Sequence, residues 1–302
     1  MKRLPQIALL PDGKRLHLQD GPIDLIIEAK GQAAEVGAAY EAAARRFTGL
    51  LDELCEELNG LRQPANPVQC ALQGVVARRM HAAVAPFAAD HFITPMAAVA
   101  GSVAEEILGA MLGAARLDRA YVNNGGDIAL HLTGGEQFTV GLMDRPDRHG
   151  LMRTMIVDAD DPARGVATSG RHGRSFSLGI ADAVTVLART ASTADAAATI
   201  IANAVDLPGH PAIVRCPANE LQPDSDLGPR LVTRDVGLLT EDEIDRALRA
   251  GANQAQQLLV AGLIEGAALR LLGETLVVGI TGGQAPALHA HHGSAIESAV
   301  HA

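Results

Sequence analysis

Three short segments of this 302-residue chain combine residue types that could bind a phosphate-bearing ligand. The first is Asn123-Asn124-Gly125-Gly126-Asp127, whose paired glycines would let backbone amides approach a diphosphate because no Cβ intervenes. Asp127 would then orient an amine or a hydroxyl group, or cap the turn. The same residue types are also typical of a plain hairpin turn, so the five letters alone leave both interpretations open.

The second segment concentrates hydroxyl, glycine and cationic residues within a few positions. It contains Thr168, Ser169, Gly170, Arg171, His172, Gly173 and Arg174. Guanidinium groups form paired hydrogen bonds with phosphate oxygens, so this run could cradle an anion. An exposed loop with solvated arginines is the alternative. His172 is the candidate general base of the chain, and its residue type is the only argument for that role.

The third segment is predicted to be a helix with one polar stripe. If Ser192 or Thr193 caps it, then Asp195, Thr199 and Asn203 follow at intervals of four residues on one face. A carboxylate and a hydroxyl one turn apart are oxygen ligands that suit Mg²⁺, which completes its shell with water and phosphate. The alternative is an acidic first turn that favours the helix dipole, with Thr199 bonded back to its own helix.

Composition limits the classes of partner. The chain has 25 Lys and Arg against 35 Asp and Glu, a formal charge of −10, which argues against a nucleic-acid or membrane partner because both need a basic surface. Its seven aromatic residues (five Phe and two Tyr) predict an aliphatic core. The three cysteines lack the spacing of a zinc site and indicate reduced thiols. With no predicted signal peptide or membrane span, we expect a cytoplasmic protein.

The elements that must position these segments follow from periodicity and turn residues. Strands are expected at 4–10, 23–29, 155–158, 165–169, 183–187 and 276–280, with a three-stranded meander at 120–123, 128–132 and 138–142. Helices are expected at 32–61, 68–92, 96–116, 193–205 and 240–271, the last begun by a Thr240–Glu243 capping box. The prediction is an α+β fold of mixed, mostly antiparallel sheets flanked by helices.

Residues 1–282 are expected to form one domain, and residues 283–302 a flexible tail with several histidines, for which metal storage is a weaker interpretation. We find no repeat of fixed period, although two halves of helix plus meander could hide a structural duplication. Small-residue helix faces at 96–116 and 240–271 are compatible with a homodimer.

The order of the motifs resembles the ApbE-like flavin transferases. Ala97-Ala98-Val99-Ala100-Gly101 precedes the Gly-Gly-Asp turn at about the spacing of that family, and Thr168-Ser169-Gly170 and Ala194-Asp195-Ala196 with Thr199 follow in the same order. The resemblance covers residues 95–205 and is greatest to a smaller cytoplasmic branch of the superfamily without an assigned function. It implies the ApbE-like, T-fold-related architecture.

The resemblance also implies Mg²⁺-dependent handling of FAD. The better-known branch cleaves the FAD pyrophosphate, transfers FMN to a threonine of a protein acceptor and releases AMP. By resemblance, Asp195 and Thr199 would be metal ligands, with the backbone carbonyl near Ala97 as a third. The turn at Asn124–Asp127 and the Thr168-Ser169-Gly170 segment would line the dinucleotide pocket.

The chain departs from the family pattern at two places. Ala100 stands where the family has lysine, and the family's His-Ile-Ile-Asp-Pro-x-Thr-Gly segment is absent between Arg171 and Ala194. Arg171 and Arg174 are expected to replace the lost positive charge. Two alternatives remain: a non-catalytic binding or interaction protein, or an enzyme that acts on a pterin-type substrate, the latter by association with methanopterin-linked one-carbon metabolism.

Overall fold

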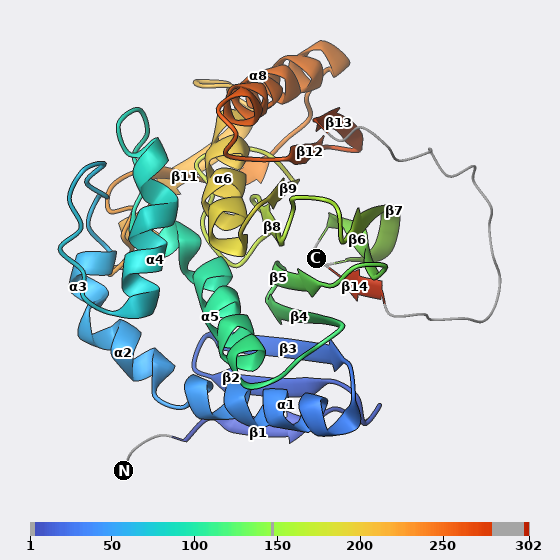
Figure 1. Ribbon diagram of the computed structural model, residues 1–302. Coiled ribbons are helices and arrows are strands. Elements are labelled where there is room, and N and C mark those ends of the chain that lie inside the picture. The colour runs from blue at the N-terminus through green and yellow to red at the C-terminus, as the bar shows by residue number, and fades with distance from the viewer. Residues whose placement is uncertain (1–3, 146–147, 280–298, 302) are drawn as a thin grey trace.

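A nine-stranded antiparallel sheet forms the centre of the protein (Figure 1). The computed structural model describes residues 4–145, 148–279 and 299–301. Across the sheet the strand order is β1-β2-β3-β4-β5-β8-β9-β12-β13. The bounds are β1 Gln6–Leu9, β2 Leu16–Asp20, β3 Ile23–Lys30, β4 Arg119–Asn124, β5 Asp127–Leu132, β8 Gly165–Ser169, β9 Ala183–Ala188, β12 Gly266–Leu271 and β13 Glu274–Val278.

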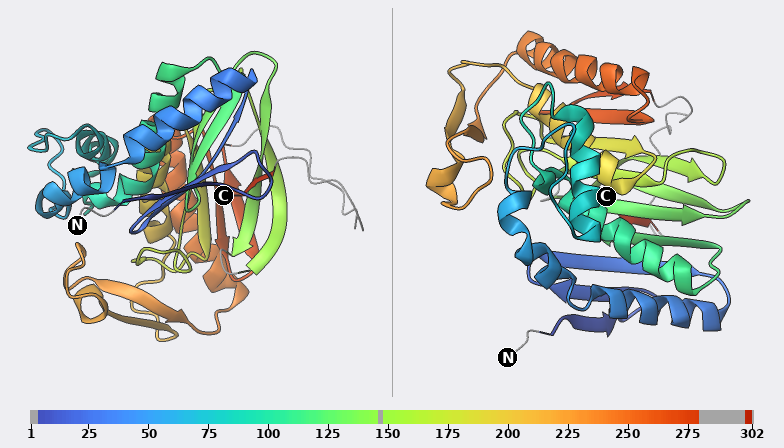
Figure 2. Two further views of the ribbon diagram at one scale, coloured as in Figure 1. Left: turned by 90° about the horizontal axis from the view of Figure 1, so that it is seen from below. Right: turned by 60° about the vertical axis from the view of Figure 1, so that its left-hand side comes forward.

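Helices cover one face of this sheet and a hairpin covers the other (Figure 2). The principal helices are α1 Ala33–Phe47, α5 Val99–Ala114, α6 Ala191–Ala204 and α8 Glu241–Val260. On the opposite face, β6 (Gln137–Arg145) and β7 (Arg148–Asp158) form a small sheet with β14 (Ala299–His301), which is parallel to β6. Smaller elements are α2 Leu50–Glu56, α3 Leu58–Leu61, α4 Val75–Val84, η1 Ala85–Phe87, η2 Pro95–Ala98, β10 Ile213–Pro217, α7 Ala218–Leu221 and β11 Leu231–Val236. The predicted α+β class, with mixed and mostly antiparallel sheets, is confirmed.

The chain folds as two similar halves that share the sheet. In the first half, the hairpin β2-β3 leads through α1 and α5 to the hairpin β4-β5. In the second half, the hairpin β8-β9 leads through α6 and α8 to the hairpin β12-β13. Each half has its own aliphatic core between its helices and its strands. The hidden duplication therefore exists at the level of topology, and the halves join where β5 pairs with β8.

Two predicted helices are shorter than expected. The expected helix at 32–61 is broken into α1, α2 and α3, because the chain turns at Gly49 with a φ of +88°. In the expected helix at 68–92, residues 68–74 are not helical. The side chain of Asn66 accepts hydrogen bonds from the amides of Val68 (2.8 Å) and Gln69 (2.9 Å), a local turn that competes with helix formation.

The predicted meander is wrong at its third strand. β4 and β5 pair as expected, but β5 continues to β8, and β6 pairs with β7 in the separate sheet. Phe138, Val140 and Val157 of this hairpin pack on the rear face of the main sheet, which buries Tyr121 and Leu130 from behind. The alternation of residues identified the strands correctly, but it carried no information about which sheet each strand joins.

Two further boundaries differ from the prediction. The helix expected at 240–271 ends at Val260, after which β12 begins at Gly266; its Thr240–Glu243 capping box is confirmed. The helix expected at 193–205 spans Ala191–Ala204, and Thr190 caps it through the amide of Thr193. The strand β2 and the ribbon β10-β11 were not predicted.

The run Pro95–Ala114 is long and apolar enough to cross a membrane by length and composition alone. Here it is η2 followed by α5, and Val103, Ile107 and Met111 are fully buried in the core of the first half. Most of the expected tail at 283–302 lies outside the described residues, apart from the short strand β14.

Candidate functional site

The first turns of α5 and α6 meet at the centre of the helical layer, where the two halves join (Figure 1). Their starts interlock: Ala98, just before α5, lies in the core of the second half, and Ala191, at the start of α6, lies in the core of the first. Gly101 makes this approach possible, since a Cβ there would lie 2.3 Å from the carbonyl oxygen of Ala191. Two positive helix ends are therefore held side by side.

Asp195 lies one turn into α6 and faces the start of α5. Its Oδ2 accepts a hydrogen bond from the amide of Gly101 at 3.0 Å, so it caps a helix whose own N-cap, Ala98, has no capping side chain. Burial raises the pKa of Asp195 well above its ordinary value, and the neighbouring carboxylates of Asp127 and Glu105 raise it further. A carboxylate in these surroundings favours a bound proton or a bound cation.

The Gly125-Gly126 turn joins β4 to β5 directly beside this helix junction. Its backbone needs glycine at Gly125, where φ is +66°, and the amide of Gly126 donates to Asn123 Oδ1 at 2.8 Å. Asn124 anchors the turn to α5, because its Nδ2 donates to the carbonyl of Ala100 at 3.2 Å. The segment is thus a hairpin turn, as one interpretation of the sequence held, and it is tied to the helix junction.

Asp127 places a second carboxylate in the same site. Its Oδ1 accepts a hydrogen bond from the amide of Thr168 at 3.2 Å, which joins the glycine turn to the Thr168-Ser169-Gly170 segment. Desolvation raises the pKa of Asp127 to about 7, although the Thr168 amide and the nearby Arg174 guanidinium act in the opposite direction. Arg174 lies over the turn, with its Nη1 3.2 Å from the position of a Cβ on Gly125.

Arg171 and His172 contact a different carboxylate. Arg171 donates from both Nε (2.9 Å) and Nη2 (2.6 Å) to Oδ1 of the buried Asp182, and His172 Nε2 lies 3.2 Å from the same oxygen. The other oxygen of Asp182 accepts from the amide of Leu272 at 2.6 Å. Asp182 therefore fastens the loop after β8 to the turn between β12 and β13. Arg174 is the cation of this loop that lies beside the glycine turn, and the predicted base role of His172 stays a prediction.

The remaining predicted residues lie around the same junction. Thr199 is half-buried one turn beyond Asp195 on α6, and α6 packs against η2, the short helix that contains Ala97. Thr168 Oγ1 lies 2.9 Å from Thr185 Oγ1, and Ser169 ends β8 with its side chain partly exposed. The structure thus gathers the three segments in one region, while the metal and cofactor roles of these residues stay predictions.

The sequence analysis missed one charged pair at the junction. Glu105 accepts the amide of Ser192 at 2.6 Å, and its other oxygen lies 3.3 Å from Arg79 on α4. The sequence marks Glu105 as the acidic residue four positions after Gly101, a place that matches that of Asp195 after Ser192, but it does not show the contact with α6. Nothing in the sequence connects Arg79 with this site.

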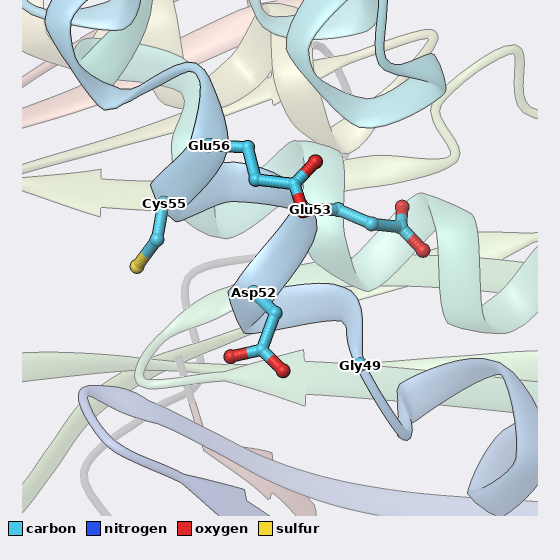
Figure 3. A pocket seen from close by; sticks show the side chains of 5 residues that line it. All are labelled: Gly49, Asp52, Glu53, Cys55 and Glu56. Carbon is cyan, nitrogen blue, oxygen red and sulfur yellow. The ribbon is translucent and has the colours of Figure 1, made fainter. Parts of the chain in front are cut away.

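Two other structural features bear on the choice of site. Among the described residues, no group of three or more His, Cys, Asp or Glu side chains could hold a metal, so a cation here would need neutral oxygen atoms or the ligand itself. A shallow open depression lies on α2, lined by Gly49, Asp52, Glu53, Cys55 and Glu56 (Figure 3). The carboxylate of Asp52 points away from that of Glu53, and an acidic surface would repel a phosphate-bearing ligand.

The fold and the site define an α+β protein in which two helix ends, a glycine turn and a carboxylate pair converge. Residues 7–277 match the family described as "AbpE bacteria", and the chain belongs to this family. The resemblance to ApbE-like proteins is therefore confirmed.

Curated relatives match a shorter stretch of the chain. A UPF0280 protein of Methanopyrus kandleri is 39% identical over 128 residues, which are 42% of this chain and 48% of that protein. A UPF0280 protein of Archaeoglobus fulgidus is 36% identical over 143 residues, 46% of this chain and 54% of that protein. The chain spans about half the length of the curated relatives it matches. The apo flavinyl transferase ApbE of Pseudomonas stutzeri aligns with 91% of this chain and 94% of its own, at 10% identity and a TM-score of 0.44.

Proposed function

We propose that the protein binds Mg²⁺ and a phosphate-bearing ligand at the junction of its two halves, with a flavin nucleotide such as FAD as the first candidate. The activity that follows from this proposal is pyrophosphate cleavage or FMN transfer to a protein acceptor. The ligand class rests on family membership and on the chemistry of the site.

The carboxylates of Asp127 and Asp195 carry the proposal. They come from different halves of the fold, both residues are partly buried, and the charge of Asp127 raises the pKa of Asp195. Two anionic groups brought together in a partly buried place destabilise the metal-free protein unless a proton or a cation neutralises one of them. A bound cation would relieve this repulsion, and the pair therefore supports a metal site at the junction.

The available donors fit Mg²⁺ better than a transition metal. Asp195 and Asp127 offer carboxylate oxygens, Thr199 offers a hydroxyl and Ala97 a backbone carbonyl, and all of these are the hard oxygen ligands that Mg²⁺ prefers. When bound, Mg²⁺ would neutralise negative charge on pyrophosphate oxygens. The protein's own part is to hold its oxygen atoms in place through the helix ends and the glycine turn.

The surroundings of the carboxylates suit a diphosphate. The paired glycines present backbone amides without a Cβ, the first turns of α5 and α6 contribute two positive helix ends, and the Arg174 guanidinium lies over Gly125. Arg174 supplies a charge near the place where the family's lysine is replaced by Ala100. Because the guanidinium of Arg171 is paired with Asp182, compensation for that lysine falls to Arg174.

The decisive experiment incubates the purified protein with FAD and Mg²⁺ and separates AMP and FMN by chromatography. Release of AMP that requires both Mg²⁺ and Asp195 would establish pyrophosphate chemistry, with an Asp195→Asn variant as the control. Release that is equal in the variant, or in EDTA, would show that contaminating activity is the source. If no AMP appears, a thermal-shift titration with Mg²⁺ and FAD distinguishes a binding protein from a protein without this site.

A non-catalytic binding protein is the second candidate. The observation that favours it is Ala100, whose amide faces Asp195 and whose methyl group cannot supply the charge of a lysine. In that case Mg²⁺ and FAD would raise the melting temperature together, while FAD remained intact after prolonged incubation. A pterin-type ligand would be tested in the same titration in place of FAD.

A further inference from the structure

The first-turn amides of α5 and α6 are each accepted by a carboxylate of the other helix. The amide of Gly101 on α5 donates to Asp195 of α6, and the amide of Ser192 on α6 donates to Glu105 of α5. Asp195 lies three residues after Ser192, and Glu105 lies four residues after Gly101, so on each helix the donor and the acceptor share one face. Each helix therefore supplies an acceptor for the other at the point where they meet.

These two hydrogen bonds satisfy amides that have no acceptor within their own helix. The four first amides of any helix lack a partner of that kind, and α5 has no capping side chain of its own. In α6 the cap Thr190 accepts the amide of Thr193, and Glu105 accepts that of Ser192. Loss of either carboxylate would leave the amide of a buried residue unpaired at a tightly packed contact.

Arg79 holds Glu105 in place from outside the pair of helices. Its Nε lies 3.3 Å from Glu105, and its Nη1 donates to the carbonyl of Ser102 at 3.1 Å and to Glu106 at 2.9 Å. These contacts fasten the guanidinium to the first two turns of α5. Glu105 therefore has a fixed position from which it can hold α6.

We propose that Glu105, held by Arg79, is a positioning residue: through the Ser192 amide it fixes the first turn of α6 so that Asp195 faces the start of α5 and the glycine turn. The metal-binding part of this inference rests on the proposed function. Without Glu105 the first turn of α6 is free to shift against α5, and the Asp195–Gly101 hydrogen bond weakens with it.

The test compares Glu105→Ala, Glu105→Gln and the matched control Glu106→Ala in the full chain. Glu106 is the next residue on α5 and forms ion pairs with Arg46 and Arg79, whereas its described contacts do not include α6. Hydrogen exchange of the Gly101 amide is followed by NMR with isotope-labelled glycine, and Mn²⁺ alone is titrated by electron paramagnetic resonance.

We expect Glu105→Ala to speed exchange at Gly101 and to weaken Mn²⁺ binding by about tenfold or more, the size typical of residues that orient metal ligands. Glu105→Gln should restore both within about threefold, because its neutral side-chain oxygen still accepts the Ser192 amide. Glu106→Ala should lower stability without changing either readout. Equal effects of the two alanine variants would overturn the inference and leave Glu105 a structural residue.

The two readouts separate this inference from the proposed function. If the unaltered protein does not bind Mn²⁺, the metal-binding proposal fails, and the exchange rate of Gly101 still decides whether Glu105 positions Asp195. If Mn²⁺ binds and Glu105→Ala leaves exchange at Gly101 unchanged, the metal site stands and the positioning role is wrong.

Discussion

Glu105 and Asp195 accept first-turn amides from each other's helices, yet their surroundings differ. Glu105, from the first half, has Arg79 at 3.3 Å. Asp195, from the second half, has Asp127 as the neighbouring charge with the largest effect on its pKa, and no ion pair with Lys or Arg is found for it among the described residues. Both carboxylates therefore accept a helix amide. The charge of Glu105 is balanced by Arg79, whereas no ion pair among the described residues balances that of Asp195.

This difference in charged neighbours distinguishes a structural role for Glu105 from the ligand-binding role proposed for Asp195. A carboxylate that only joins two helices is best placed beside a cation, as Glu105 is. A carboxylate left beside a second carboxylate raises the free energy of the metal-free fold, a cost that functional sites commonly carry. The two halves thus resemble each other in topology, and they diverge at the contact where ligand binding is expected.

The largest expected effect comes from separating the two helix starts. Gly101→Val would place a Cβ 2.3 Å from the Ala191 carbonyl oxygen, and we expect a loss of about 3 kcal/mol or more in the free energy of unfolding. The matched control is Gly109→Ala on the same helix, where a Cβ would meet no atom within 4 Å; it should stabilise by about 0.5–1 kcal/mol. Urea denaturation measures both, and similar values for the two variants would contradict the interlocked helix starts.

Alanine substitutions of the two arginines in the loop after β8 should change different properties: Arg171→Ala the stability, and Arg174→Ala the ligand affinity. Arg171→Ala breaks the buried pair with Asp182 and should cost about 3 kcal/mol of stability. Arg174→Ala removes an exposed side chain, so stability should change by less than about 0.5 kcal/mol while the affinity for ADP falls by about tenfold. Calorimetry gives both quantities. A normal ADP affinity in Arg174→Ala would exclude this guanidinium from the phosphate site.

Replacing Asp195 or Glu105 by its neutral amide should change the stability of the protein in opposite directions. At pH 8 without metal, Asp195→Asn relieves the repulsion from Asp127 and should stabilise by about 1–2 kcal/mol, with loss of any stabilisation by Mg²⁺. Glu105→Gln keeps an oxygen for the Ser192 amide but loses the charge that attracts Arg79, and it should destabilise by about 1 kcal/mol. Destabilisation of the metal-free protein by Asp195→Asn would mean that Asp195 serves mainly as a helix cap.

The smallest effect is a dependence on pH. Because the folded-state pKa of Asp127 is about 7 against an ordinary 3.8, its contribution to stability is present in full below about pH 4 and is lost as pH rises through 7. Metal-free protein should therefore have a lower melting temperature at pH 8 than at pH 6, with a free energy of unfolding lower by up to about 1.4 kcal/mol in total. Asp127→Asn should flatten this slope. An unchanged slope in that variant would assign the titration to another group.

The sequence correctly predicted the elements that carry the three candidate segments. It identified the Gly125-Gly126 turn, the Thr168-Ser169-Gly170 segment and the helix of Asp195 in their correct elements. It did not reveal that Arg171 pairs with Asp182, or that the first turns of α5 and α6 meet. Gly101 and Asp195 are 94 residues apart in the chain, and Arg171 and Asp182, although only 11 residues apart, are of common types that no local pattern marks as partners.

What the sequence by itself determined is most of the elements, with β2, β10, β11 and β12 as exceptions, and several of the turns that begin and end them, because periodicity, capping residues and glycine act within a few positions of the chain. The tertiary structure decided which strands became neighbours, since β5 pairs with β8 and leaves β6 to form another sheet. It also decided the charge environment of each carboxylate. Desolvation and the approach of Asp127 to Asp195 depend on how the two halves pack, and only packing distinguishes a helix cap from a candidate ligand of a metal.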